Sequence, residues 1–336
     1  MRGTVTYISM WPETHSPSHT EFSSSEVRFE NEHILALSNV RTGERIELVP
    51  SLGGAVTELL LSTEGRLRSV IRGDSWNELK PNPAYRGRLL FPFCCRIPEG
   101  RYIFQGREYT FPINRHAEPS ALHGLLYSNA MSVHAIEAFP GGIQAVLGFR
   151  TEADHYPGYP FRVTFQAAYT LRRGIFELRL TAVNDGDRDA PVAFGWHPYF
   201  YASPDLALLC AGRVYVEVDS KKIPTGRMPQ TQGTRFDFSS PVSIVEIPKL
   251  DEALSVPPRG RTILTSNDGS VVIEQDPQVF KYVQFYLPSD RQSIAIEPIT
   301  SPANSFNHPE FGLDVLRPGD RLSGTIAVHL TDSLFA

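Results

Sequence analysis

Three short segments, far apart in the chain, each set one proton-transferring side chain among apolar and aromatic residues. They are LHG at 122–124, GWHPYF at 195–200 and IAIEP at 294–298. The imidazole of His197 lies among aromatic residues, where desolvation and stacking can tune its pKa near neutrality. Glu297 ends an apolar run and is costly to bury without a partner or a task. Two imidazoles and a carboxylate held this way predict an acid–base site beside a flat ligand such as a sugar.

Each candidate also has an ordinary structural explanation. His123 could be a turn histidine, His197 a core histidine bonded to a carbonyl, and Glu297 a sheet carboxylate paired with an arginine. Arg96 could be an ion-pair partner, and Asp251 a cap of a helical turn. Taken singly, these explanations are about as good as the functional ones, so the order and context of the motifs must decide.

Familiar catalytic signatures are absent from the sequence. There is no GxGxxG or GxxxxGK[ST] phosphate loop, no GxSxG elbow, no HExxH helix and no CxxC pair. His123 and His197 lack any familiar metal-ligand spacing. We therefore expect neither a metal nor an organic cofactor.

Composition limits the classes of partner. With 336 residues, 41% hydrophobic residues and a net charge of −5, the chain resembles an ordinary globular protein without the basic excess that nucleic acid requires. Three cysteines, two of them adjacent, offer no simple disulfide framework and favour a reducing compartment. No apolar run reaches transmembrane length, and the N-terminus lacks a secretory h-region. We expect a cytoplasmic protein, either monomer or homodimer, that contacts no membrane.

The elements that must position these residues read as strands. Short alternating runs separated by Gly, Pro, Asn and Asp recur from about residue 26, without a helical period longer than about ten residues. The clearest runs are 45–49, 101–104, 108–111, 161–167, 175–181, 214–218, 271–274 and 325–330. The pattern predicts an all-β fold, a large antiparallel β-sandwich with few short helices. We expect a flexible lead-in over residues 1–25 and one domain over 26–336.

The order of the motifs resembles the aldose 1-epimerase (galactose mutarotase-like) family. The resemblance covers roughly residues 35–330 and depends on several motifs together. In chain order these are Arg96, GREY at 106–109, LHG at 122–124, FGWHPYF at 194–200, PTG at 224–226, TRFDF at 234–238, LD at 250–251 and EPITSPAN at 297–304. The family fold is an antiparallel supersandwich, in agreement with the strand pattern.

The resemblance implies a role for each candidate. His197 would be the general acid and Glu297 the general base of an enzyme that interconverts the α and β anomers of a free hexose or similar aldose. Arg96, His123 and Asp251 would bind sugar hydroxyls, and no cofactor would be required.

Two departures bear on the substrate. Cys95 precedes Arg96, where sugar mutarotases often carry Asn, and Leu125-Leu126-Tyr127 stands where hexose-6-phosphate members often carry an arginine. A hexose-6-phosphate 1-epimerase remains an alternative, with Arg115 and Arg162 as candidate phosphate ligands. A non-catalytic sugar-binding protein of the same fold is the other alternative, although binding alone does not need an opposed acid–base pair.

Overall fold

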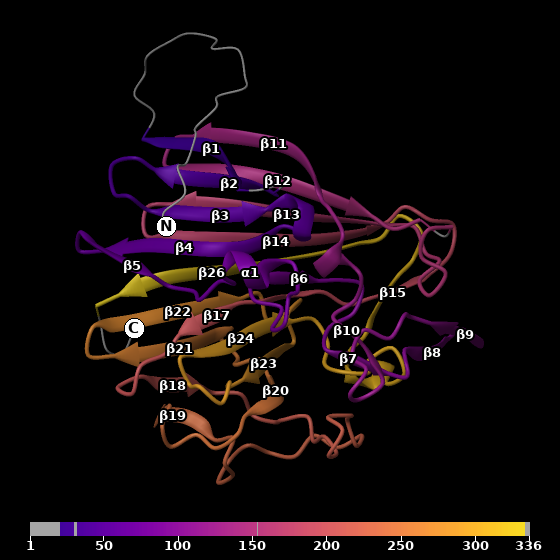
Figure 1. Cartoon of the computed structure of the whole chain (residues 1–336). Coiled ribbons are helices and arrows are strands. Elements are labelled where there is room, and N and C mark those ends of the chain that lie inside the picture. Colours follow the sequence, from indigo (N-terminus) through magenta and orange to yellow (C-terminus); the bar gives the residue numbers. More distant parts are fainter. Residues whose placement is uncertain (1–20, 30–31, 153, 333–336) are drawn as a thin grey trace.

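The structure is a computed structural model that describes residues 21–29, 32–152 and 154–332. Its largest element is a nine-stranded antiparallel sheet that runs through the molecule (Figure 1). In spatial order its strands are β11 (Ser132–Phe139), β12 (Gly142–Arg150), β13 (Val163–Arg172), β14 (Ile175–Asn184), β26 (Arg321–Thr331), β22 (Gly269–Gln275), β21 (Arg261–Ser266), β18 (Ala207–Cys210) and β19 (Phe238–Ser243).

Two further sheets pack against this one. The first has five strands in sequence order: β1 (Phe22–Phe29), β2 (Glu32–Asn39), β3 (Arg45–Val49), β4 (Ala55–Thr63) and β5 (Arg66–Ser69). The second has the order β20 (Asp251–Ser255), β23 (Tyr282–Tyr286), β24 (Ser293–Ile299), β16 (Gly195–His197) and β6 (Arg88–Leu90), with β17 (Tyr199–Tyr201) also paired to β24.

The remaining elements are short. Three two-stranded sheets join β7 (Arg96–Pro98) to β10 (Ser120–Leu122), β8 (Arg101–Phe104) to β9 (Arg107–Thr110), and β15 (Ala190–Val192) to β25 (Asp314–Leu316). The described helices are α1 (Trp76–Leu79) and the 3-10 turns η1 (Pro50–Leu52), η2 (Leu126–Ser128) and η3 (Pro309–Phe311). In the described ranges no helix combines the length and hydropathy that a membrane crossing requires.

One hydrophobic cluster fills the space between the layers. The five-stranded sheet packs against strands β11, β12, β13 and β26 of the nine-stranded sheet, and the two sheets overlap in the view of Figure 1. Elsewhere Phe176 of β14 meets Trp196 of β16, with ring centroids 5.4 Å apart. The alternation of inward apolar and outward polar residues that predicted the strands therefore builds the core. The predicted antiparallel sandwich with few short helices is confirmed.

Two local expectations differ from the structure. β1 begins at Phe22, whose buried ring anchors it, so residues 22–25 belong to the sheet and not to the expected lead-in; residues 1–20 lie outside the described residues. The predicted strand at 214–218 forms only isolated bridges, to Gln230, Leu254 and Pro224. Prolines facing this segment, such as Pro224, have no N–H to donate and interrupt the ladder.

A buried carboxylate joins two of the sheets. Glu44 is 0% exposed, and its carboxylate accepts hydrogen bonds from the backbone N–H of Ser62 on β4 and of Gly174 in the β13–β14 turn, at 3.1 and 2.7 Å. It also accepts from the hydroxyl groups of Ser62 and Thr42. Removal of this acceptor leaves several donors without a partner.

We expect Glu44→Ala to lower the free energy of unfolding by about 3 kcal/mol, because two backbone donors and two hydroxyls lose their acceptor. Glu137→Ala, at an exposed position of β11, is the matched control and should change it by less than about 0.5 kcal/mol. Urea unfolding followed by circular dichroism measures both. Equal stability of the two variants would contradict the bridging role of Glu44.

Candidate active site

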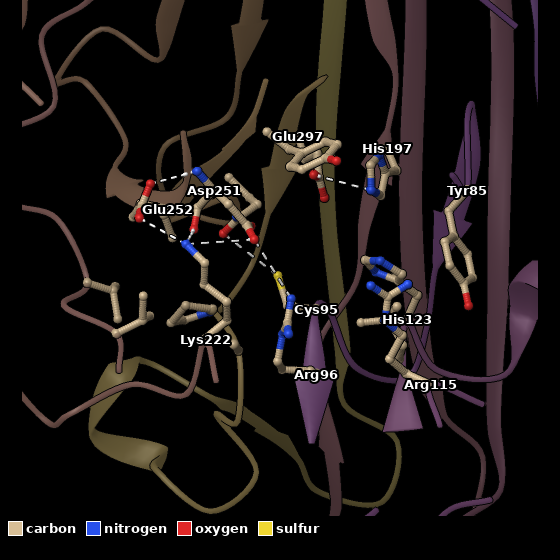
Figure 2. Close-up of a pocket in the computed structure, with 18 of the residues that line it drawn as sticks. Tyr85, Cys95, Arg96, Arg115, His123, His197, Lys222, Asp251, Glu252 and Glu297 are labelled. Atoms are coloured by element: carbon tan, nitrogen blue, oxygen red, sulfur yellow. Dashed lines mark hydrogen bonds and ion pairs between the residues drawn. The ribbon is translucent and has the colours of Figure 1, made fainter. Parts of the chain in front are cut away.

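All five residues singled out from the sequence line one pocket, where the six-stranded sheet meets β7 and β10 (Figure 2). His197 ends β16, Glu297 lies in β24 and Asp251 begins β20. Arg96 begins β7, and His123 directly follows β10. Segments separated by up to two hundred residues therefore contribute to one concave site, which is the arrangement expected of a small-molecule pocket.

The centre of the pocket is a buried histidine–glutamate pair. His197 Nε2 lies 3.3 Å from Glu297 Oε1, and the two side chains are 6% and 2% exposed. His197 Nδ1 and Glu297 Oε2 are buried and have no hydrogen-bond partner within the described part of the chain. Both atoms are therefore available to hydrogen-bond to a hydroxyl group of a ligand, and no existing hydrogen bond has to break.

Strand alternation aims His197 into the pocket. Its neighbour Trp196 points to the opposite side, where it is fully buried and donates its indole N–H to the Gly87 carbonyl at 3.2 Å. On the adjacent segment Tyr199 stacks on His197, with centroids 5.2 Å apart and planes within 7°. The aromatic sequence around His197 thus fixes the plane of the imidazole.

Burial moves the two pKa values of the pair in opposite directions. Desolvation raises the pKa of Glu297 well above its ordinary value, and the Asp251 charge raises it further. Desolvation also lowers the pKa of His197, with a smaller contribution from Arg86. Because the ion pair and the neutral pair carry the same single proton, burial weakens the usual preference for the ion pair. Both shifts move the shared proton toward Glu297.

His123 is presented by a left-handed turn. Its φ is 62°, and its backbone N–H donates to the Cys95 carbonyl at 2.8 Å. The next residue, Gly124, has φ 78°, and a Cβ there would lie 2.1 Å from the Phe91 carbonyl oxygen, so only glycine fits. The His123 ring contacts His197 and Tyr85 at centroid distances of 5.0 and 4.6 Å. Burial lowers its pKa well below the usual value.

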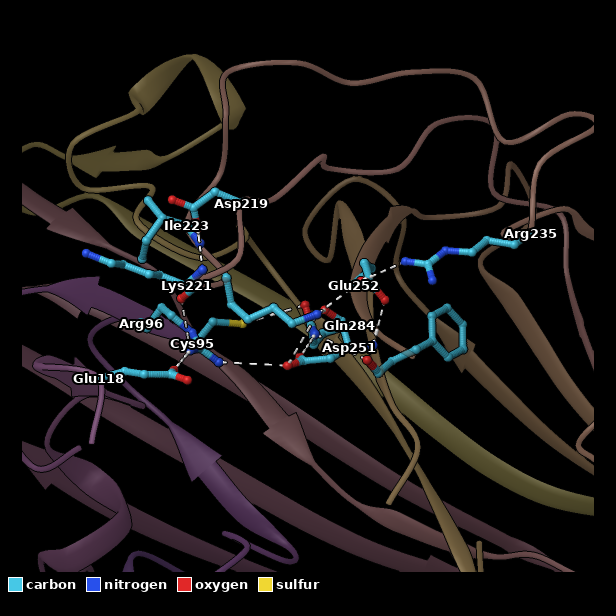
Figure 3. A network of polar contacts seen from close by, with 12 residues as sticks. Cys95, Arg96, Glu118, Asp219, Lys221, Ile223, Arg235, Asp251, Glu252 and Gln284 are labelled. Carbon is cyan, nitrogen blue, oxygen red and sulfur yellow. Dashed lines mark hydrogen bonds and ion pairs between the residues drawn. The ribbon is translucent and has the colours of Figure 1, made fainter. Parts of the chain in front are cut away.

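The opposite wall is a network of charges around Asp251 (Figure 3). Arg96 donates to Glu118 at 3.0 Å and lies 3.9 Å from Asp251. Lys222 contacts Glu252 at 3.1 Å and Asp251 at 3.9 Å. Desolvation still raises the pKa of Asp251, although Lys222 and Arg96 oppose this shift. The wall is rich in acceptors and donors suited to sugar hydroxyl groups.

Sequence reasoning missed several pocket residues. Lys222, Glu252, Gln284 and Tyr85 line the pocket but were not singled out. Gln284 had a visible signal, since it is an amide within the apolar strand YVQFY, and its side chain donates to Asp251 at 3.1 Å. Lys222 had no visible signal in the sequence, because its side chain reaches the pocket from a residue with a left-handed backbone conformation, φ 64°.

Cys95 also lines the pocket. Its Sγ lies 3.9 Å from Gln284 Oε1, and burial raises its pKa well above the usual value. It is therefore a neutral thiol at physiological pH and not a thiolate nucleophile. Because a thiol bonds hydroxyl groups weakly, this part of the wall is less polar than an amide would make it.

Of the two suggested phosphate ligands, one reaches the pocket. Arg115 lines it, whereas Arg162 pairs with Glu152 beside a separate surface hollow. Arg96 and Lys222 also line the pocket, but carboxylates already neutralise both. Among the described residues no group of three or more His, Cys, Asp or Glu side chains could hold a metal ion.

The fold and the pocket together define a class: an antiparallel supersandwich with a histidine–glutamate pair in a polar, aromatic-walled cleft. The family profile described as aldose 1-epimerase matches residues 40–329. The chain belongs to the aldose 1-epimerase family.

Curated relatives agree with this assignment. The uncharacterized protein YihR of Escherichia coli K12 is 30% identical over 69% of this chain and 74% of its own length. Galactose mutarotase of Mus musculus is 30% identical over 58% of this chain, and the match spans 57% of that protein.

Solved structures share the fold. A galactose mutarotase-like protein from Clostridium acetobutylicum has a TM-score of 0.81 at 19% identity, covering 93% of this chain and 99% of its own. Galactose 1-epimerase from Lactobacillus acidophilus has a TM-score of 0.76 at 17% identity, covering 93% and 98%.

Proposed function

We propose that the protein is an aldose 1-epimerase, which interconverts the α and β anomers of a free hexose or similar aldose. The observation that carries the proposal is the buried His197–Glu297 pair, which holds one transferable proton and two unpartnered polar atoms at the base of the pocket. Family membership and the mutarotase relatives support it.

The reaction uses both placements of that proton. Glu297, as the carboxylate, takes the proton from the anomeric hydroxyl while His197, as the imidazolium, gives one to the ring oxygen. The C1–O5 bond breaks and the open-chain aldehyde forms, which leaves a neutral acid and a neutral imidazole. Rotation about C1–C2 presents the other carbonyl face, and the two transfers reverse on closure. No proton is gained or lost overall.

The pKa shifts suit this cycle. A raised pKa makes Glu297 a stronger base, and a lowered pKa makes the His197 imidazolium a stronger acid. Both shifts therefore favour the two proton transfers that open the ring from the ion pair. The sugar hydroxyl groups would bind to His123, Arg96 and Asp251. Gln284 and Lys222 both contact Asp251 and so support the same wall of the pocket.

The phosphosugar alternative has one point in its favour. Of the described basic side chains that line the pocket, Arg115 has no ion pair to a carboxylate. A phosphate dianion needs more than one charge-assisted partner, and Arg96 and Lys222 already contact carboxylates. We therefore favour an unphosphorylated sugar.

The direct test is polarimetry of freshly dissolved α-D-glucose, α-D-galactose and glucose 6-phosphate, each with and without the protein. We expect accelerated mutarotation of at least one free sugar and a smaller effect on the phosphosugar. Faster turnover of glucose 6-phosphate would select the alternative enzyme. Binding of a sugar without any acceleration would select the non-catalytic sugar-binding protein.

We expect Glu297→Gln and His197→Asn each to lower kcat by about 10²-fold or more, because each removes one of the two proton-transfer groups. The double variant should lose less than the summed effects, since both groups act in one step. His123→Asn is the comparison variant and should raise KM at least as much as it lowers kcat. Near-normal turnover by Glu297→Gln would exclude Glu297 as the base and make Asp251 the next carboxylate to test.

The dependence of kcat/KM on pH should be bell-shaped. At low pH the pair takes a second proton, which must enter a buried imidazole whose pKa is lowered, so the acid limb should lie below the ordinary histidine value of 6.5. At high pH the pair loses its last proton from a carboxyl whose pKa is raised, so the alkaline limb should lie above the ordinary glutamate value of 4.5. Initial rates at several pH values would locate both limbs, and a rate independent of pH would contradict a one-proton pair.

A further inference from the structure

We propose that a buried ion pair outside the pocket, Asp74–Arg86, is a positioning pair that orients His197. Arg86 Nη1 lies 2.8 Å from Asp74 Oδ1, and the two side chains are 13% and 0% exposed. The inference rests on the proposed function of His197. Neither residue lines the pocket, so any effect on the reaction must pass through another group.

The pair joins the two segments that flank His197 and Tyr199. Gly87, next to Arg86, donates its backbone N–H to the His197 carbonyl at 2.8 Å. Arg72, two residues before Asp74, donates its backbone N–H to the Tyr199 carbonyl at 2.7 Å. The ion pair therefore links the segment of Arg72 and Asp74 to the segment of Arg86 and Gly87. Both segments are hydrogen-bonded to the backbone at His197 and Tyr199, so the link restrains the backbone that carries the imidazole.

Tyr199 connects the pair to the imidazole. The guanidinium carbon of Arg86 lies 5.5 Å from the centroid of the Tyr199 ring, and that ring stacks on His197. A cation over an aromatic face is attracted to it, so Arg86 holds the ring that holds the imidazole. Loss of Arg86 would free the plane of His197 as well as remove a charge.

The charge of Arg86 acts on the proton of His197. After desolvation, the positive charge of Arg86 contributes to the lowered pKa of His197, while the residue's own main chain opposes the shift. Asp74 offsets part of the Arg86 charge. The described groups that face His197 or the pair include Glu297, His123, Tyr199, Arg88 on the paired strand β6, and Glu78 at 3.8 Å from Arg86. Asp290, the partner of Arg72, also interacts electrostatically with Arg86.

The two members of the pair should thus have opposite effects on acidity. Without the Arg86 cation the imidazolium becomes easier to form, so the pKa of His197 rises. Without the Asp74 anion the Arg86 charge is less compensated, so the pKa of His197 falls further. A purely structural role would not give opposite signs.

The test compares kcat, KM and pH profiles of Arg86→Gln, Arg86→Lys and Asp74→Asn. For Arg86→Gln we expect kcat to fall about 10-fold, KM to stay within about twofold, and both limbs of the profile to move to higher pH by up to about one unit. Arg86→Lys keeps the charge and should keep the limbs in place. Asp74→Asn should move them to lower pH.

Arg72→Gln is the matched control, because this arginine lies on the same flank but its guanidinium pairs with Asp290 at 2.9 Å. It should leave the limbs unchanged. Circular dichroism and thermal unfolding identify variants that fold, and the near-isosteric Asp74→Asn keeps the test available if Arg86→Gln does not. Limbs that stay at wild-type positions, or move in the same direction in Arg86→Gln and Asp74→Asn, would overturn the proposal.

A second measurement separates this proposal from the proposed function. The ¹⁵N shifts of the His197 ring, assigned by comparison with His197→Asn, report the protonated fraction in sugar-free protein. At a given pH this fraction should be larger in Arg86→Gln than in wild type. If it is, and no sugar is turned over, the positioning pair stands and the epimerase assignment fails; an unchanged fraction overturns the pair whatever the activity.

Discussion

The site depends on the removal of water from two ionisable groups that remain within 3.3 Å of each other. An isolated charge on either group would be costly to bury, and as neighbours the two groups share one proton that burial moves toward Glu297. Backbone hydrogen bonds hold the two residues in place. Glu297 is held by the pairing of β24 with β23, and His197 by the backbone N–H of Gly87, which donates to its carbonyl. The desolvation that lowers the stability of the protein is also the main cause of the shifted pKa values of the pair.

The polar groups of the pocket form two sets that differ in their hydrogen-bond and ion-pair partners. On one side His123, His197 and Glu297 are buried and keep unpartnered atoms. On the other side Asp251, Glu252, Lys222 and Arg96 neutralise one another in an ion-pair network. In the proposed reaction, the anomeric centre of a sugar would meet the His197–Glu297 pair while its other hydroxyl groups would bond to the charged wall. A fully charged ligand would have to break that network.

Sequence reasoning predicted the fold from local strand pattern, whereas the five chosen residues, which all line the pocket, were selected by the order of motifs along the chain. The alternation in β3 and β26 follows directly from the two-residue period of a strand, and His197 and Glu297 were visible as polar residues in apolar surroundings. The failed strand at 214–218 shows the limit, since its alternation is good but its neighbours include prolines that cannot complete a ladder. Asp74 and Arg86 are equally invisible, because only tertiary packing brings their buried side chains together.

Two of the four pocket residues that sequence reasoning missed, Tyr85 and Lys222, share a backbone property with two that it noticed. Tyr85, Cys95, His123 and Lys222 all line the pocket, and all have left-handed conformations with φ between 53° and 64°. Residues other than glycine are strained in this conformation, so surrounding contacts must stabilise each of them. For His123, one such contact is the hydrogen bond from its backbone N–H to the Cys95 carbonyl. Four such residues around one pocket indicate that the loops were not free to relax. This part of the pocket is therefore shaped by tertiary constraints on its loops, which leave no pattern in the sequence.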